Sequence, residues 1–351
     1  MTRLALVMIA RDEARAIGRA LMSARPHVER MIVLDTGSAD ETREIAAANG
    51  AEVFRFAWCD DFGAARNAAL AHSDADWNLV LDADEWIEDG GAQALGQDAL
   101  PAGGAEFLGE VCVRSHMDEA GGEGVGQAWI ARVLPRGVAY EGRIHEQPQS
   151  ALPRRRLALS LGHDGYLAAS LARKGERNEI LLMRELQDAP QDAYLWFQLG
   201  KEHQARGRAP QAALCFEEAL KFAGPDPPFR HALVVRGLIA LKANGQLGEA
   251  LALADAEVAR WQASPDFYFT VGDLYLEAAS QNPDRALSEF LPVVEAAWKR
   301  CLEIGERPEL DGAVAGRGGH MAAHNLAVFY ETLGRQDQAA EYREMAERLR
   351  S

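Results

Sequence analysis

Positive charge is in short supply in this sequence. Its 37 lysine and arginine residues stand against 53 aspartate and glutamate residues, which leaves a formal net charge of −16. A general nucleic-acid binder needs a basic surface against the phosphates, and binding to an anionic membrane needs the same. Both classes are therefore disfavoured. The one basic triplet, residues 154–156, is interpreted as a solvated strand end or loop.

Cysteines and long apolar runs are also scarce. The four cysteines, Cys59, Cys112, Cys215 and Cys301, form no Cys-X-X-Cys pair, which excludes a zinc ribbon or a dithiol redox motif. Their wide spacing is typical of buried free thiols in a reducing compartment. No apolar run approaches the roughly 18 residues of a membrane helix, and residues 1–10 lack a signal-peptide pattern. We expect a cytoplasmic protein without a transmembrane segment.

Three widespread catalytic signatures are missing as well. No Gly-X-Gly-X-X-Gly follows the first predicted strand, which disfavours a dinucleotide-binding dehydrogenase. No Gly-X-X-X-X-Gly-Lys-Ser/Thr is present, which excludes a P-loop enzyme. The Gly-X-Ser-X-Gly elbow of α/β-hydrolases is absent too.

The first 165 residues alternate short apolar runs with helical patterns. Strands are predicted at 4–9, 31–34, 52–56 and 77–81, and helices at 13–25, 41–49 and 62–72. Such alternation is typical of a parallel sheet covered by helices on both faces. Further along, short strands are predicted at 110–114 and 128–134, with a Gly-rich surface loop at 121–126.

After Tyr166 the pattern turns helical. Residues 167–186 are predicted to form one long linking helix. Trp196, Leu199, Gly200, His203, Ala212, Phe216 and Ala219 have a spacing that recurs from Ala323 to Ala346. This is the pattern of a tetratricopeptide repeat of about 34 residues, in which small residues such as Gly200 let two antiparallel helices approach closely. We predict an α/β domain at 1–165, a link at 166–192 and an all-α repeat domain at 193–351, with an insertion between 281 and 319.

The strongest local signal for chemistry is Asp82-Ala83-Asp84, directly after an apolar strand. Side chains at the carboxyl end of such a strand lie at the edge where open α/β sheets bind ligands. Mg²⁺ and Mn²⁺ prefer oxygen ligands and commonly bridge to substrate phosphates. The two carboxylates therefore predict a metal that neutralises a departing diphosphate. The alternative is a capping aspartate in a solvated turn.

Other motifs follow the neighbouring predicted elements. They are Met8-Ile9-Ala10-Arg11-Asp12-Glu13, Val33-Leu34-Asp35-Thr36-Gly37-Ser38, Asp61-Phe62-Gly63-Ala64-Ala65-Arg66-Asn67, Tyr140-Glu141-Gly142-Arg143-Ile144-His145-Glu146 and Gly162-His163-Asp164-Gly165-Tyr166. In this order they resemble the family 2 inverting glycosyltransferases of the GT-A fold, a Rossmann-like fold of nucleotide-diphospho-sugar transferases. The resemblance is strongest to the subgroup whose catalytic domain precedes tetratricopeptide repeats, which includes S-glycosyltransferases that modify peptide bacteriocins.

The resemblance implies a role for each matching residue. Asp35 matches the position that contacts the nucleotide base, and Ala10 and Arg11 lie where the first loop approaches the nucleoside. Asp82 and Asp84 match the motif for the metal and the ribose-diphosphate. Arg66 matches a basic position near the diphosphate, and phosphates do need such a positive charge. The structural alternative for Asp35 is a helix cap or a turn residue, and for Arg66 it is an ion pair with Asp60 or Asp61.

The general base is the least determined part of the implied site. The acceptor-side aspartate pair of many relatives has no counterpart that can be aligned here, and His145 and Glu146 are the best substitutes. His145 could ligate the metal and Glu146 could accept the acceptor's proton. The alternative is a strand-end histidine and a solvated glutamate. His163, Asp118 and Glu119 are further candidates.

The resemblance therefore implies an enzyme that transfers a sugar, with inversion, from a nucleotide-diphosphate donor in the presence of Mn²⁺ or Mg²⁺. The repeats are expected to hold a peptide or protein acceptor. The alternatives are that the repeats only cover the apolar side of the first domain or form a homodimer. Two other functions compete: a non-catalytic repeat scaffold with a degenerate first domain, and a nucleotidyltransferase. The second is disfavoured because no Gly-rich phosphate loop with Lys or Arg follows the first strand.

Overall fold

The computed structural model describes residues 2–96, 99–101, 106–119, 122–166 and 177–350, and within these it does not describe the side chains of 116–119, 122–124 and 164–166. The chain forms two compact units, Met1–Leu181 and Leu182–Ser351. The division falls inside helix α6 (Arg177–Asp188). The first part of the predicted linking helix, residues 167–176, lies outside the described residues. The boundaries at 165 and 193 stay predictions.

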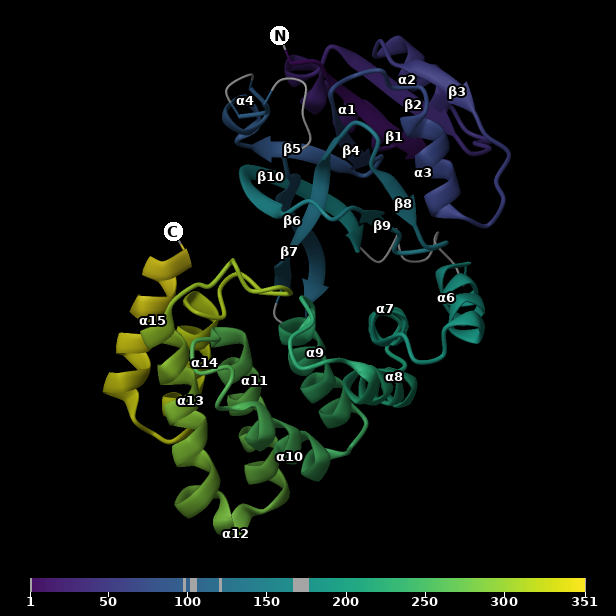
Figure 1. Cartoon of the computed structure of the whole chain (residues 1–351). Coiled ribbons are helices and arrows are strands. Elements are labelled where there is room, and N and C mark those ends of the chain that lie inside the picture. The colour runs from purple at the N-terminus through teal and green to yellow at the C-terminus, as the bar shows by residue number, and fades with distance from the viewer. Residues whose placement is uncertain (1, 97–98, 102–105, 120–121, 167–176, 351) are drawn as a thin grey trace. The chain divides into compact units, whose positions relative to one another are not determined.

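The first unit is built on a mixed sheet of eight strands in the order β3-β2-β1-β4-β7-β6-β10-β5 (Figure 1). These strands are β1 (Leu4–Ala10), β2 (Arg30–Asp35), β3 (Glu52–Arg55), β4 (Trp77–Asp82), β5 (Glu85–Asp89), β6 (Leu108–Glu119), β7 (Gly122–Pro135) and β10 (Arg154–Tyr166). The strands β1 to β4 are all parallel, as the sequence predicts. Strand β7 then pairs antiparallel with β4, and β5 pairs antiparallel with β10. Two short strands, β8 (Ala139–Glu141) and β9 (Gln147–Gln149), form a separate hairpin.

Helices cover both faces of the parallel part of this sheet. They are α1 (Ile17–Ala24), η1 (Arg25–His27), α2 (Thr42–Ala48), α3 (Phe62–Leu70) and α4 (Gly91–Ala94). Because side chains alternate along a strand, Leu6 and Met8 of β1 pack into the core that contains α1, while Val7 packs on the opposite face with Ala69 of α3. The expected covered parallel sheet is therefore confirmed.

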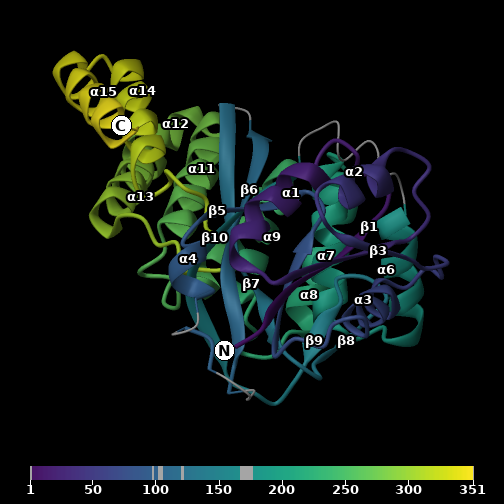
Figure 2. The same cartoon turned by 90° about the horizontal axis from the view of Figure 1, so that it is seen from above.

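The Gly-rich stretch departs from the prediction. Residues 122–126 are not a surface loop but the first part of β7, paired residue by residue with β6 from Glu119↔Gly122 to Ser115↔Gly126. The two long strands lie side by side in both views of the molecule (Figures 1 and 2). A continuous ladder of backbone hydrogen bonds satisfies glycine as well as any other residue. The high glycine content alone therefore gave a wrong prediction of a loop.

The second unit is a series of antiparallel helix pairs. Its helices after α6 are α7 (Ala193–Ala205), α8 (Ala209–Phe222), α9 (Arg230–Ala243), α10 (Leu247–Glu257), α11 (Pro265–Gln281), α12 (Pro283–Arg285), the π-helix η2 (Ala286–Phe290), α13 (Leu291–Ile304), α14 (His320–Thr332) and α15 (Gln336–Arg350). A Cβ at Gly200 would lie 2.5 Å from the Phe216 ring, which confirms the close approach of α7 and α8. The break at α12 and η2 and the connection 305–319 lie within the predicted insertion.

None of the described helices is both long enough and apolar enough to cross a bilayer.

Candidate active site

Three of the predicted site residues meet at one edge of the sheet. In the parallel register Ala10 lies opposite Asp35, and Ile9 lies opposite Asp82. The ends of β2, β1 and β4 are therefore neighbours, at the carboxyl edge where open α/β sheets bind ligands. Asp82 keeps 34% of its side chain exposed, whereas Asp35 is only 2% exposed.

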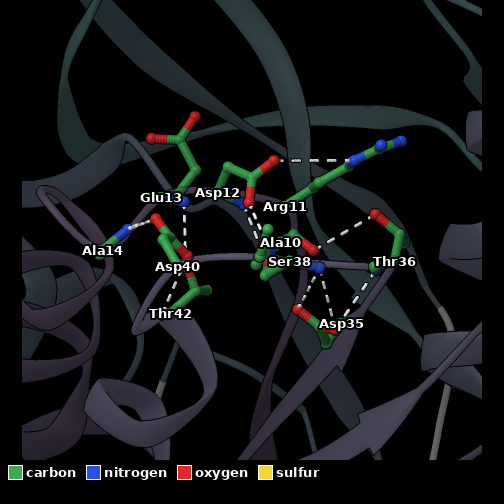
Figure 3. Close-up of polar contacts among 12 residues, drawn as sticks. Ala10, Arg11, Asp12, Glu13, Ala14, Asp35, Thr36, Ser38, Asp40 and Thr42 are labelled. Atoms are coloured by element: carbon green, nitrogen blue, oxygen red, sulfur yellow. Dashed lines mark hydrogen bonds and ion pairs between the residues drawn. The ribbon is translucent and has the colours of Figure 1, made fainter.

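Asp35 is held by its own turn (Figure 3). Its Oδ1 accepts hydrogen bonds from the backbone N–H groups of Gly37 and Ser38, each at 3.2 Å. The same oxygen forms an ion pair of 3.2 Å with Arg43. Ser38 N–H also reaches Oδ2 at 3.2 Å. The turn role that the sequence left open is thus present, and Oδ2, with the fewest donors, is the oxygen best placed to accept a ligand's N–H.

The loop after β1 is fastened to the loop after β2 by reciprocal hydrogen bonds (Figure 3). Asp12 has a positive φ of 56°, accepts from Ala39 N–H at 2.7 Å and donates its own N–H to Ser38 Oγ at 3.0 Å. Thr36 N–H donates to the Ala10 carbonyl at 2.9 Å. Arg11 reaches outward and lies 3.8 Å from Asp12, with 44% of its side chain exposed. The two loops form one wall joined by hydrogen bonds, with the exposed cation of Arg11 beside it.

Arg66 lies at the centre of a charged cluster. It comes from α3, is 6% exposed, and its Nη2 lies 2.6 Å from Asp82 Oδ1. Its Nε donates to Glu146, which brings the fourth sequence motif to the same place. The alternative interpretation paired Arg66 with Asp60 or Asp61, whereas its ion-pair partners are Asp82 and Glu146. Its Nη1 is buried and has no hydrogen-bond partner in the described part of the chain.

The segment that carries His145 and Glu146 is tied to α3. Asn67 and Tyr140 exchange hydrogen bonds of 2.9 Å and 2.7 Å, and Phe62 N–H donates to the Arg143 carbonyl at 2.8 Å. His145 adopts a left-handed φ of 51°, which is uncommon outside glycine. This strained residue turns the chain so that Glu146 points back at Arg66. The side chain of Glu146 is only 8% exposed, so it is not the solvated glutamate of the alternative interpretation.

A second guanidinium group stands on the other side of Asp82. Arg132 of β7 is 6% exposed and donates from Nη2 to Asp82 Oδ2 at 2.6 Å and to Glu85 Oε1 at 2.5 Å. Glu85 Oε2 in turn accepts the backbone N–H of Asp82 at 3.0 Å. The sequence interpretation missed both residues. An arginine inside the apolar run from Ile130 to Leu134 is the signal that could have indicated a buried acidic partner.

Asp84 lies next to a histidine from a distant strand. Its Oδ2 is 3.6 Å from Nε2 of His163 on β10, and His163 Nδ1 is within hydrogen-bond distance of Ser115 Oγ at 3.0 Å. Both side chains are largely buried, at 9% and 12% exposed. His163 was a lesser candidate in the sequence. The side chains of Asp118 and Glu119 lie outside the described ones.

Four carboxylates and two guanidinium groups share this small volume. Burial alone would raise the pKa of Asp82, but Arg132 and Arg66 outweigh it and hold that pKa far below its ordinary value. For Glu85 burial prevails and raises the pKa, although Arg132 opposes it. Burial also raises the pKa of Tyr140 to about 12, so its hydroxyl keeps its proton at neutral pH. The surplus of acidic groups favours a bound cation.

Comparisons with known proteins match the first part of the chain to one family. Residues 5–95 match the family described as glycosyl transferase family 2. The chain is 32% identical over 280 residues to a TPR repeat-containing protein of Synechococcus elongatus, across 75% of this chain and 66% of that protein. It is 27% identical over 204 residues to the SPbeta prophage-derived glycosyltransferase SunS of Bacillus subtilis, across 56% of this chain and 48% of SunS.

Among solved structures, the chain is similar to glucosyl-3-phosphoglycerate synthase from Mycobacterium tuberculosis in complex with Mn²⁺ and uridine diphosphate. The likeness covers 32% of this chain and 43% of that one, at 23% identity and a TM-score of 0.25. By the family match over residues 5–95, the chain has an N-terminal family 2 glycosyltransferase domain, followed by a TPR-like helical region. It spans about half to two thirds of the length of the two curated relatives.

Proposed function

We propose that the chain is an inverting glycosyltransferase that moves a sugar from a nucleotide-diphosphate donor to an acceptor. One observation carries the proposal. Asp82, Asp84 and the buried cation Arg66 all belong to the segment that matches family 2, and they lie together at the carboxyl edge of the sheet. A nucleotide sugar needs acceptors for its base and ribose, and positive charge for its phosphates.

The nucleoside would lie against the wall formed by the loops after β1 and β2. Asp35 Oδ2 would accept an N–H of the base, and Ala10, opposite Asp35 at the end of β1, would lie beside it. Arg11, half exposed at the rim, can swing toward the nucleoside or its phosphates. Because the loops are already cross-linked by hydrogen bonds, the base would enter a preformed site.

Asp84 and His163 fit a divalent cation such as Mn²⁺ or Mg²⁺. Their oxygen and nitrogen are suitable ligands, and because these atoms lie 3.6 Å apart, the two side chains would have to approach one another slightly to share one metal. The described residues contain no group of three or more histidine, cysteine or acidic side chains that could hold a metal, so phosphate oxygens and water would complete the coordination. When bound, the cation would neutralise charge on the departing diphosphate. His145 remains the alternative imidazole ligand.

Arg66 would bind the diphosphate through its buried Nη1, which has no hydrogen-bond partner among the described residues. As the diphosphate approaches, it competes for Arg66 with Glu146 and releases that carboxylate. Glu146 would then accept the acceptor's proton while the acceptor atom attacks the anomeric carbon and the bond from that carbon to the diphosphate breaks. The nucleoside diphosphate leaves from the opposite face, which inverts the configuration.

The test measures transfer and donor hydrolysis with a set of nucleotide sugars, with Mn²⁺ and with a chelator. Asp84→Ala should reduce turnover by about 10²-fold or more, since metal and transition-state charge stabilisation are lost together, while the fold is kept. Turnover in Asp84→Ala equal to that of the unaltered chain would refute the assignment. Nucleotide binding without any turnover would instead favour a non-catalytic scaffold, and release of diphosphate from a nucleotide triphosphate would favour a nucleotidyltransferase.

For the acceptor we propose a peptide or protein held by the helical unit. A hollow of about 360 Å³ lies in that unit, lined in part by Lys242, Asp273, Leu276 and Glu277. Leu276 is a large apolar side chain that lines this hollow and is 42% exposed. Leu276→Asp should raise the KM for a peptide acceptor and leave donor hydrolysis unchanged. Leu214→Asp, at a residue 56% exposed on α8, is the control, and equal effects of the two variants would contradict the proposal.

A further inference from the structure

Arg132 is a buried cation that contacts neither the loop after β1 nor the loop after β2. It lies on β7, the strand inserted antiparallel between β4 and β6. Its neighbours Ala131 and Val133 are core residues, and its Nε has no hydrogen-bond partner in the described part of the chain. A guanidinium in such a place is costly to bury unless carboxylates compensate it.

The compensation forms a closed ring of contacts. Nη2 of Arg132 reaches Asp82 Oδ2 at 2.6 Å and Glu85 Oε1 at 2.5 Å, and the other oxygen of Glu85 accepts the Asp82 backbone N–H at 3.0 Å. Asp82 and Glu85 are the first and last residues of one turn. The ring therefore fixes both ends of the turn that contains Asp84.

The two guanidinium groups divide the oxygens of Asp82 between them. Arg132 takes Oδ2 from the β7 side, and Arg66 takes Oδ1 at 2.6 Å from the α3 side. The Asp82 carboxylate cannot rotate without breaking one ion pair. Asp84 follows from the same turn and lies beside His163. The arrangement sets the distance between the residues proposed to hold metal and diphosphate.

We propose that Arg132 is a positioning residue for sugar transfer, anchored by Glu85, which holds the Asp82–Glu85 turn in the geometry that binds metal and diphosphate. This inference rests on the proposed function. Arg132 itself is proposed to contact neither the metal nor the diphosphate. Supporting residues that orient metal ligands typically change metal affinity or activity by roughly 10–100-fold when they are replaced.

The experiment titrates Mn²⁺ into the full chain with uridine diphosphate or guanosine diphosphate as the probe, followed by the loss of the free Mn²⁺ paramagnetic resonance signal. Arg132→Met should raise the apparent Kd for Mn²⁺ by roughly 10–100-fold and raise the donor KM. Arg132→Lys should recover part of this, because an ammonium supplies the charge but not the planar fork that serves two carboxylates. Glu85→Gln keeps two polar atoms and should raise the apparent Kd for Mn²⁺ less than Arg132→Met does.

Arg114→Met is the matched control. It removes an ion pair of 3.2 Å with Glu88, from the neighbouring strand β6, and should leave Mn²⁺ affinity unchanged. If Arg132→Met fails to fold, Arg132→Lys carries the same test by its raised Kd. Mn²⁺ binding that both Arg132 variants retain would overturn the role of Arg132 alone. No Mn²⁺-dependent binding of either nucleotide to the unaltered chain would overturn the proposed function, and this role with it.

Discussion

The contact between α3 and the segment that carries Glu146 can be tested by adding a single methyl group. Gly63 is the second residue of α3, and a Cβ there would lie 2.6 Å from the Gly142 carbonyl oxygen, nearer than the 3.0 Å below which Cβ contacts are essentially never found. The oxygen belongs to the backbone and the added Cβ is fixed by the backbone of α3, so no side-chain rotation can relieve the contact. Gly63→Ala must push residues 142–146 away from the helix.

The expected magnitude combines two opposing effects. Replacing glycine by alanine within a helix stabilises by up to about 1 kcal/mol, while overpacking destabilises by about 1–3 kcal/mol. Gly63→Ala should therefore lower the free energy of unfolding by about 0–3 kcal/mol. Transfer should fall further, by roughly 10–100-fold, because a displacement near 1 Å moves Glu146 from Arg66.

Gly18→Ala provides the matched control. Gly18 is the second residue of α1, and its added Cβ would meet Ile45 at 3.5 Å, an ordinary contact. That variant should be as stable as the unaltered chain or more stable, with full activity. Denaturant unfolding and donor turnover are measured for both. If Gly63→Ala behaves like Gly18→Ala in both assays, the packing argument for Glu146 is wrong.

Three further outcomes are expected. Asp35→Ala should weaken donor binding more than it slows turnover, because a base contact exists in ground and transition states alike; unaltered donor affinity by calorimetry would leave Asp35 only its turn. Glu146→Gln should slow transfer by about 10²–10⁴-fold if Glu146 is the base, and near-normal transfer would return that role to His145, Asp118 or Glu119. Burial raises the pKa of Glu306 above its ordinary 4.5, although N–H groups of Gly316 and Gly318 oppose it. The folded state thus binds this proton more tightly, and its contribution to stability is lost as the pH rises from 4.5 through the raised pKa. The free energy of unfolding of Glu306→Gln, measured with denaturant, should therefore depend less on pH in that range than that of the unaltered chain.

The parts of the fold that could be predicted are those with a local signal. The strands β1, β2 and β4 are apolar almost throughout, since both faces of the sheet are covered, and their boundaries were predicted to within one residue. Strand β5 gave no such signal. Its sequence Glu85-Trp86-Ile87-Glu88-Asp89 is acidic and follows the Asp-X-Asp turn, yet pairing with β10 makes it a strand. A distant partner decides such a segment.

The same distinction between local and long-range signals applies to the candidate site. Ala10, Asp35 and Asp82 could be placed together from sequence because each ends a parallel strand, and parallel register brings such ends to one edge. Arg132 could not be placed, because its contact with Asp82 depends on β7 pairing antiparallel with β4 across about fifty residues of chain. The contact between Asp84 and His163 has the same origin, in the long-range pairing of β10.

Charge balance gives a physical reason why nucleotide and cation should bind together. The cations Arg66 and Arg132 are already shared among Asp82, Glu85 and Glu146, so the site has no net positive charge to offer a diphosphate. Adding a diphosphate alone would place like charges within a buried volume, which is unfavourable at low dielectric. A divalent cation beside Asp84 removes that repulsion, and release of Glu146 from Arg66 removes more. Under the proposed function, we therefore expect the ion pairs that keep two arginines buried in the free protein to make its affinity for the donor dependent on metal.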